Sequence, residues 1–208
     1  DLPEEGIPAG LNWERWLGPN TIYRPYNKEL APDLAYEQKI WPHWRNYIDF
    51  GGGMMTDWGA HMFDIAQWGL DMDNSGPVSL QISGPGQQGG LIYTYANGIT
   101  MTHRLLTQGT SPYTKFTGEG GEVHVQRGRL STTPENLKDK VLTDTDKRVY
   151  ASDNHYADFI TAMDSRKPPI CDVETGHRSA TIGTIGNIAY LLGRSLTWDP
   201  VKERFAND

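Results

Sequence analysis

The sequence predicts an α+β domain in which an open, mainly antiparallel β-sheet carries helices packed on one face. Three observations indicate this class. The glycine-led stretch Gly51–Leu70 has an apolar repeat of helical period and contains no proline. Residues 78–133 contain short segments of alternating apolar and polar side chains, separated by turns with glycine. Two further segments of helical pattern follow in the last third of the chain.

The composition narrows the class of protein. The chain has 208 residues, enough for a single domain with a core, and its seven Trp and ten Tyr bury large areas each. A net charge of −7 disfavours nucleic-acid binding, which needs basic patches. No apolar run approaches the roughly 18 residues of a membrane span. One cysteine excludes an internal disulfide framework.

The start of the sequence does not indicate where in the cell the protein is located. Because the first residue is Asp1 rather than Met, we expect the native N-terminus to be missing. A cytoplasmic or a periplasmic location is normally read from that region. The localisation is therefore left open.

Residues 1–50 form a segment rich in proline and tryptophan. Prolines spread through it prevent long helices and central strands, and its aromatic content is too high for a disordered tail. We expect an ordered loop segment that belongs to the same domain as residues 51–208. Its aromatic rings are interpreted either as a wall for the apolar face of a sugar or as lid residues packed on the sheet: Trp13, Trp16, Tyr23, Tyr26, Trp41, Trp44 and Tyr47.

The central helix, predicted over Gly51–Leu70, is expected to carry the chemistry. On a helix, Asp57, His61, Asp64 and Trp68 fall on one narrow stripe because they are spaced by four, three and four residues. Two carboxylates and an imidazole on a rigid element suit general acid–base catalysis, although such side chains are also common on a solvated helix face. A neighbouring stripe is predicted to face the core: Trp58, Met62, Ile65, Ala66 and Gly69.

The sheet is predicted from the segments that follow the helix. Alternating side chains in LIYTYA and ITMTHRL, joined by Asn97-Gly98, indicate a β-hairpin. The pattern continues through residues 113–133, which predicts one antiparallel meander of about five strands. One face of this sheet is left for helices.

Two helices and a short strand are expected to end the chain. The first helix starts near Ser152 or Asp153, ends before Lys167, and buries Phe159, Ile160 and Met163. His155 stands in its first turn, either as a simple exposed residue or as a substrate contact. The second helix starts at 172–174 and ends at 193–194, and a strand follows at 196–198.

The chain resembles the C-terminal domain of the glucose-fructose oxidoreductase/inositol dehydrogenase/rhizopine-catabolism (Gfo/Idh/MocA) oxidoreductases. The resemblance rests on WRNYIDFGGGMMTDWGAHMFDIAQW, on NHYADFITAM, and on ETGHRSATIGTIGNIAYLLGR with the later LTWDP. It covers most of the chain from about Trp13 and is strongest to a bacterial subgroup with the same Trp-rich entry. Its most specific part is the GGG-x3-D-x-G-x-H-x2-D motif.

The resemblance implies that a full-length relative begins with a Rossmann domain and a Glu-Lys-Pro motif whose lysine is catalytic. Neither appears in these residues, so we expect a substrate-side domain that is inactive alone. It also implies NAD or NADP in the full-length protein, with none bound to this chain, and a sugar, cyclitol or derivative as substrate. Homo-oligomers through the open sheet face are expected as well, with neither nucleic acid nor membrane as partner.

Individual roles follow from the matched motif positions. The resemblance makes His61 the general acid/base and Asp57 the residue that holds its tautomer or a substrate hydroxyl. Arg45 and Trp44 match a segment that lines the substrate pocket, and Arg45 is alternatively a surface ion-pair partner. Asp64 and His155 complete the expected substrate-side set, with Asp64 supporting the helix or a loop.

Three other functions remain open at this stage. An NAD-dependent glycosidase or lyase oxidises its sugar transiently and cleaves a bond. A metal site is conceivable at Asp57, His61 and Asp64, which offer mixed nitrogen and oxygen ligands on adjacent turns. A non-catalytic sugar-binding or oligomerisation module is the third.

Overall fold

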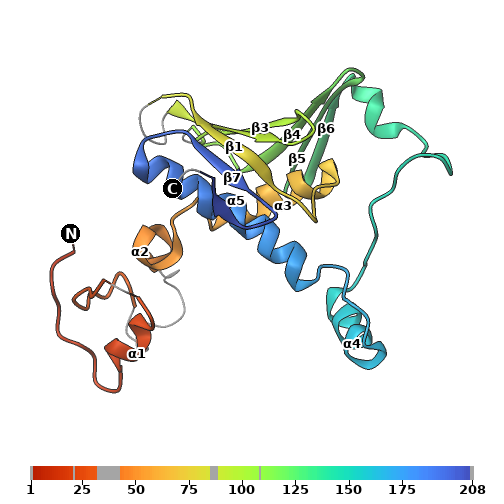
Figure 1. Cartoon of the computed structure of the whole chain (residues 1–208). Coiled ribbons are helices and arrows are strands. Elements are labelled where there is room, and N and C mark those ends of the chain that lie inside the picture. Colours follow the sequence, from red (N-terminus) through yellow and green to blue (C-terminus); the bar gives the residue numbers. More distant parts are fainter. Residues whose placement is uncertain (1, 21, 32–42, 85–88, 108, 207–208) are drawn as a thin grey trace. The chain divides into compact units, whose positions relative to one another are not determined.

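The computed structural model describes residues 2–20, 22–31, 43–84, 89–107 and 109–206. By their internal contacts these divide into two compact units, residues 1–57 and 58–208 (Figure 1). The chain is α+β with antiparallel sheets, as the sequence predicts. None of the described helices is both long enough and apolar enough to cross a membrane.

The first unit is built around an aromatic core. It contains α1 (Trp13–Leu17), the 3-10 helix η1 (His43–Asn46) and α2 (Ile48–Gly51). The Trp13 ring is buried, stacks on Trp16 at a centroid distance of 4.6 Å, and meets the edge of Tyr26. Its Nε1 donates to the Arg24 carbonyl oxygen at 2.7 Å. The described part of this segment is therefore ordered by its own rings; Trp41 lies outside the described residues.

The predicted central helix is divided at the glycine run. Gly52 takes a left-handed conformation with φ of 73° and caps α2, its N–H donating to the Ile48 carbonyl at 3.2 Å. A turn over residues 54–57 follows, and α3 (Trp58–Leu70) begins only after it. The prediction that Asp57 lies on the helix is therefore wrong, because Asp57 belongs to the turn directly before it.

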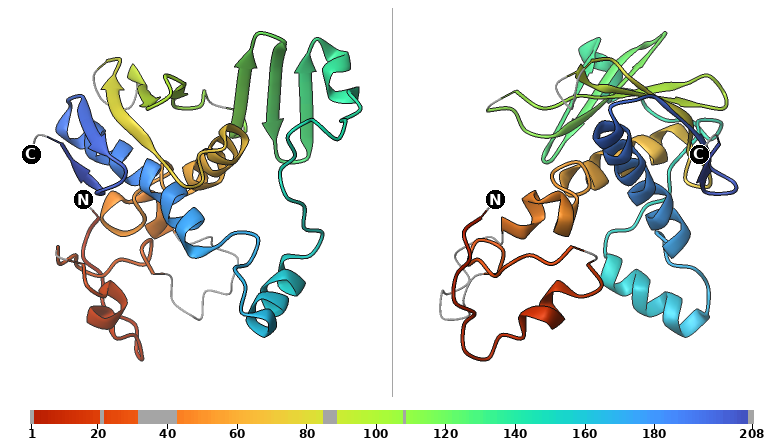
Figure 2. Two further views of the ribbon diagram at one scale, coloured as in Figure 1. Left: turned by 45° about the vertical axis from the view of Figure 1, so that its right-hand side comes forward. Right: turned by 60° about the vertical axis from the view of Figure 1, so that its left-hand side comes forward.

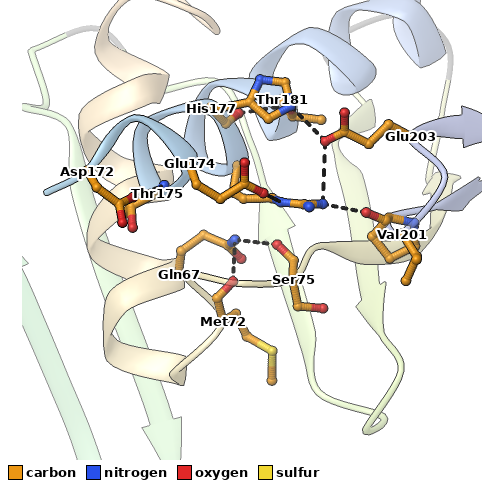
Figure 3. A network of polar contacts seen from close by, with 12 residues as sticks. Gln67, Met72, Ser75, Asp172, Glu174, Thr175, His177, Thr181, Val201 and Glu203 are labelled. Carbon is orange, nitrogen blue, oxygen red and sulfur yellow. Dashed lines mark hydrogen bonds and ion pairs between the residues drawn. The ribbon is translucent and has the colours of Figure 1, made fainter. Parts of the chain in front are cut away.

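The buried face of α3 also differs from the predicted stripe. Its buried residues are Phe63, Ala66 and Gln67, whereas Gly69 is exposed. Gln67 donates to the carbonyls of Met72 and Ser75 at 3.0 and 3.1 Å (Figure 3). Its Oε1 accepts a hydrogen bond of 2.6 Å from the Tyr95 hydroxyl. Burial of a glutamine is favourable here because all these polar groups are paired.

Five strands form the larger sheet, in the order β3-β2-β1-β7-β8. They are β1 (Pro77–Ile82), β2 (Leu91–Tyr95), β3 (Thr100–His103), β7 (Leu196–Asp199) and β8 (Arg204–Phe205). The predicted hairpin at Asn97-Gly98 is confirmed between β2 and β3, with Gly98 at a φ of 85°. The predicted strand 196–198 is β7, which pairs with β1 through Leu80 and Leu196.

A second sheet of three strands has the order β4-β5-β6. They are β4 (Tyr113–Gly118), β5 (Gly121–Gln126) and β6 (Arg129–Thr133). The expected single meander is thus wrong, because the strands separate between β3 and β4. Pro112, which has no N–H to donate to a ladder, stands directly before β4. The other edge of the first sheet is extended by β7 and β8, which come from the end of the chain.

The 20-residue helix α5 (Val173–Leu192) covers one face of the larger sheet (Figure 2). Asp172 caps it and Gly193 ends it in a left-handed conformation, as predicted. The buried Tyr93 hydroxyl donates to the Ile182 carbonyl at 3.0 Å, which ties sheet to helix. Near the other end, Glu203 accepts from His177 Nε2 at 2.6 Å and pairs with Arg178 (Figure 3).

Helix α4 (His155–Ser165) differs from its prediction in two respects. Its cap is Asn154, whose side chain accepts from two backbone N–H groups, rather than Ser152 or Asp153. The side chains predicted to be buried, Phe159, Ile160 and Met163, are each more than half exposed. No described element covers this face. The short helix η3 (Glu135–Asp139) lies in the exposed segment between β6 and α4.

The buried Gln67 supplies a test of the fold. Gln67→Met keeps the approximate volume but leaves the Tyr95 hydroxyl and two carbonyls unpaired, at about 1–3 kcal/mol for each buried unsatisfied group. We expect the free energy of unfolding in urea to fall by about 3 kcal/mol. Gln81→Met, at an exposed position of β1, should change it by less than about 0.5 kcal/mol. Equal effects of the two changes would contradict a structural role for the Gln67 amide.

Candidate functional site

An ion pair between Arg45 and Asp57 joins two of the residues that the sequence singles out. Arg45 lies in η1, and its Nε and Nη2 each donate to a different carboxylate oxygen of Asp57. The side chains are only 20% and 16% exposed. The hydrogen bond to Asp57 raises the pKa of Arg45, so the guanidinium stays charged. Such two-point pairing fixes the orientation of both planar groups, so Arg45 serves here to position Asp57.

The glycine run makes this ion pair geometrically possible. A Cβ on Gly51 would lie 2.8 Å from the Cα of Arg45 and 3.1 Å from Cζ3 of Trp44. Any other residue would therefore force η1 away from α2. A Cβ on Gly52 would collide with the side chain of Thr56. The Trp44–Arg45 segment of the same chain therefore lies close to the backbone of the glycine run.

His61 lies in the first turns of α3 and is exposed to solvent. Its ring lies beside that of Trp58, with centroids 5.5 Å apart. The guanidinium carbon of Arg127, from the turn between β5 and β6, stands 5.0 Å from the centroid of the Trp58 ring. The imidazole thus stands next to an aromatic face that a cation already occupies. It is accessible for proton exchange with a bound molecule.

Asp64 and Trp68 each contact a residue from another part of the second unit. Asp64 Oδ1 accepts a hydrogen bond of 2.8 Å from the Ser179 hydroxyl, which links α3 to α5. The roles expected of Asp64, in substrate binding and in support of the helix or a loop, stay predictions. The Trp68 ring packs against Tyr150, with centroids 5.3 Å apart.

His155 is exposed at the start of α4. Its ring lies 4.2 Å from that of the adjacent Tyr156, measured between centroids. No contact within the described part of the chain joins it to another predicted site residue. Its role in substrate binding stays a prediction.

Asp73 is a polar residue that sequence reasoning missed. It follows α3 in the segment DMDN, which reads as turn chemistry only. Its Oδ1 is buried and has no hydrogen-bond partner among the described residues. Burial raises the pKa of Asp73, and the charges of Asp64, Asp71 and Asp172 raise it further. The side chain is an acid that the fold disfavours in its ionised form.

No metal centre is visible in the residues that the structure describes, since no three His, Cys, Asp or Glu side chains are grouped as ligands there. The mixed set Asp57, His61 and Asp64 does not form such a group. The carboxylate of Asp57 is instead engaged by Arg45, and that of Asp64 by Ser179.

Comparison with known proteins assigns the family. A sequence model described as "Oxidoreductase family, C-terminal alpha/beta domain", of the Gfo/Idh/MocA oxidoreductases, matches residues 1–208. The chain belongs to this family. The match covers both units of this Gfo/Idh/MocA domain, including the Arg45–Asp57 pair and the helix with His61.

Other comparisons are more distant. A solved structure described as an NAD-binding protein from Listeria innocua is 16% identical, with a TM-score of 0.49. The alignment covers 74% of this chain and 54% of that one, so the Gfo/Idh/MocA domain spans about half the length of the Listeria protein. A search of curated proteins found no significant match.

The raised pKa of Asp73 can be tested by the pH dependence of the stability of the protein. Its raised pKa means that the native state holds this proton more tightly than the unfolded chain does. The contribution of Asp73 to stability is therefore full below its unfolded pKa and is lost as the pH rises through its folded pKa. We expect Asp73→Asn to raise the urea midpoint at pH 7, and this gain to disappear near pH 3.5. A gain that is equal at both values, or Asp153→Asn behaving in the same way, would show that burial of the charge is not the cause.

Proposed function

We propose that this chain is the substrate-side half of an NAD(P)-dependent oxidoreductase that acts on a sugar, a cyclitol or a derivative by hydride transfer. Membership of an oxidoreductase family supports the reaction class. The observation that carries the assignment of the site is the exposed imidazole of His61, in the helix that begins directly after the Arg45-bound Asp57.

The glycine run does not fit a nicotinamide cofactor. A phosphate cradle needs open backbone N–H groups at glycines that lead into a helix N-terminus. Here the space at Gly51 is filled by Arg45 and Trp44, and the space at Gly52 by Thr56. We therefore assign no cofactor contact to this stretch and derive no step through the cofactor. We propose instead that NAD or NADP is held by other residues of the full-length protein, so that this chain alone is inactive.

The roles proposed for the chain's own residues follow from their surroundings. His61 removes the proton from the substrate hydroxyl that becomes a carbonyl, because histidine suits proton exchange near neutral pH. Asp57 accepts a hydrogen bond from a substrate hydroxyl through the lone pairs that Arg45 leaves open. Its two contacts to Arg45 make it a fixed acceptor rather than a second base. Trp44 is exposed beside Arg45, and its contact with a substrate stays a prediction.

Replacement of His61 tests the proposed reaction. In the full-length protein, His61→Ala should lower turnover by roughly 10²–10⁴, the usual contribution of a general base. Turnover is followed by the absorbance of reduced nicotinamide during a screen of sugars and cyclitols. His177→Ala, on α5 and paired with Glu203, is the matched control and should leave turnover within about twofold of the parent protein.

The same screen separates the alternatives. Unchanged turnover of the His61→Ala protein would remove this residue from the mechanism. Substrate cleavage with no net formation of reduced cofactor would replace the dehydrogenase proposal with a glycosidase or lyase. Sugar binding that is unaffected by the substitution, with no turnover in the parent protein, would indicate a binding module.

We also propose that the protein forms homo-oligomers through the face of the larger sheet opposite α5. On that face the register aligns a row of hydroxyl side chains across four strands: Thr100, Thr94, Ser79 and Thr197. None of the four is fully buried. Short hydroxyl side chains make a flat surface on which a second sheet packs closely.

Disruption of this row tests the proposed interface. Thr94→Arg places a charge near the centre of the row of hydroxyl side chains. Since an unpaired charge is costly to bury, this change should convert the oligomer to monomers, as measured by light scattering. Thr145→Arg, at an exposed position of the segment before α4, should leave the oligomer intact. A monomeric parent protein, or an oligomer that survives Thr94→Arg, would reject this surface.

A further inference from the structure

The first unit contains a cleft of whose lining residues only Trp44 is named above as a substrate contact. It has a volume of about 630 Å³ and lies between the end of α1 and the segment formed by η1 and α2. Small-molecule sites in proteins have volumes of roughly 300–1,000 Å³, so it is large enough for one or two sugar rings. Three aromatic and two polar residues are among those that line it: Trp16, Trp44, Phe50, Asn20 and Asp49.

The aromatic lining is held rigidly by the core of the unit. Trp16 stacks on the buried Trp13, with nearly parallel planes 14° apart. Its ring also meets Phe50 at a centroid distance of 5.5 Å. Trp44 is fixed from behind by the close approach of Gly51, yet its side chain is 37% exposed. Preorganised indole rings offer flat apolar area with little loss of conformational entropy on binding.

Polar groups lie among these rings. Arg24 Nε donates to Asp49 Oδ2 at 2.7 Å, and Arg24 Nη2 contacts the same oxygen. Within the described residues, Asp49 Oδ1 receives no hydrogen bond, so it can accept one from a ligand. Asn20 Nδ2 donates to the Asp49 carbonyl at 2.8 Å. An amide carries two such hydrogens, which leaves a second for a ligand oxygen.

Rigid rings with one carboxylate and one amide match a particular ligand chemistry. A pyranose has an apolar face of C–H groups and a rim of hydroxyls that both donate and accept hydrogen bonds. The carboxylate of Asp49 accepts hydrogen bonds from hydroxyls. Its charge is balanced by Arg24, so this ion pair offers no net positive charge for a sugar acid or a sugar phosphate.

We propose that this cleft binds a neutral saccharide unit, with its C–H face on Trp16 or Trp44 and its hydroxyls on Asp49 and Asn20. The site consists of residues of the first unit alone and requires no cofactor. It goes beyond the proposed reaction because, apart from Trp44, its lining residues have no part in that chemistry: Trp16, Asn20, Asp49 and Phe50. Binding here therefore stands or falls separately from turnover at His61.

The test measures binding to the whole chain without cofactor. The probes are glucose, galactose, maltose, cellobiose and myo-inositol, with glucuronate and glucose 6-phosphate, which both keep the pyranose ring, as anionic comparisons. Binding is followed by saturation-transfer NMR and by tryptophan fluorescence. We expect at least one neutral sugar to bind and both anions to bind at least about tenfold more weakly than their neutral parent.

Substitutions locate the binding. Trp16→Leu and Trp44→Leu should each weaken it by about tenfold, because each removes a stacking surface. Asp49→Asn should weaken binding of the neutral sugar and, because it removes the negative charge beside Arg24, reduce the discrimination against glucuronate. Trp68→Leu, which removes a tryptophan of α3 that packs on Tyr150, is the matched control and should leave the affinity unchanged.

Two results would overturn the proposal. One is the failure of every neutral sugar to bind. The other is binding that survives both Trp44→Leu and Asp49→Asn. Trp44 and Asp49 are partly exposed and lie outside the buried cluster around Trp13, so these two variants remain informative even if Trp16→Leu does not fold.

Discussion

The two-point ion pair between Arg45 and Asp57 is the constraint on which the candidate site depends. It holds Asp57, the last residue before the helix that carries His61. A pair that is largely withdrawn from water is favourable only when its geometry is good, because both charges lose hydration. That geometry requires η1 to lie against α2, which only a glycine at position 51 permits. The run of glycines is thus explained by packing within the chain.

The two proposed sites differ in what supplies their rigidity. The Arg45–Asp57 pair is fixed by hydrogen bonds between charged groups, whereas the aromatic cleft is fixed by the stack of Trp16 on the buried Trp13. The His61 imidazole has a ring contact with Trp58 but no hydrogen bond among the described residues, and it is the most accessible of the three predicted groups on or before α3. An accessible imidazole suits proton transfer from a hydroxyl, and a carboxylate held by two hydrogen bonds suits a fixed acceptor.

Sequence reasoning succeeded where local signals suffice. The Asn97-Gly98 hairpin and the Asp172 and Gly193 boundaries of α5 depend on backbone conformations that these residues favour in any context. It failed where burial depended on distant partners. Gln67 is buried because Tyr95 and the turn after α3 pair with its amide, and no periodicity of apolar residues reveals this. The opposite error occurred at α4, where side chains predicted to be buried are exposed. An apolar stripe on a helix does not show whether another element covers it.

The α+β class, the family and the candidate site residues can be inferred from the amino-acid sequence, because periodicity, turn residues and a spaced motif are local properties. The three-dimensional fold was needed to show that Arg45 pairs with Asp57 and that the strands separate into two sheets. It was also needed to show that Trp16, Asn20 and Asp49 line one cleft. These facts join residues that are distant along the chain. They follow from which surfaces exclude water together, and this is a property of the folded chain rather than of any segment.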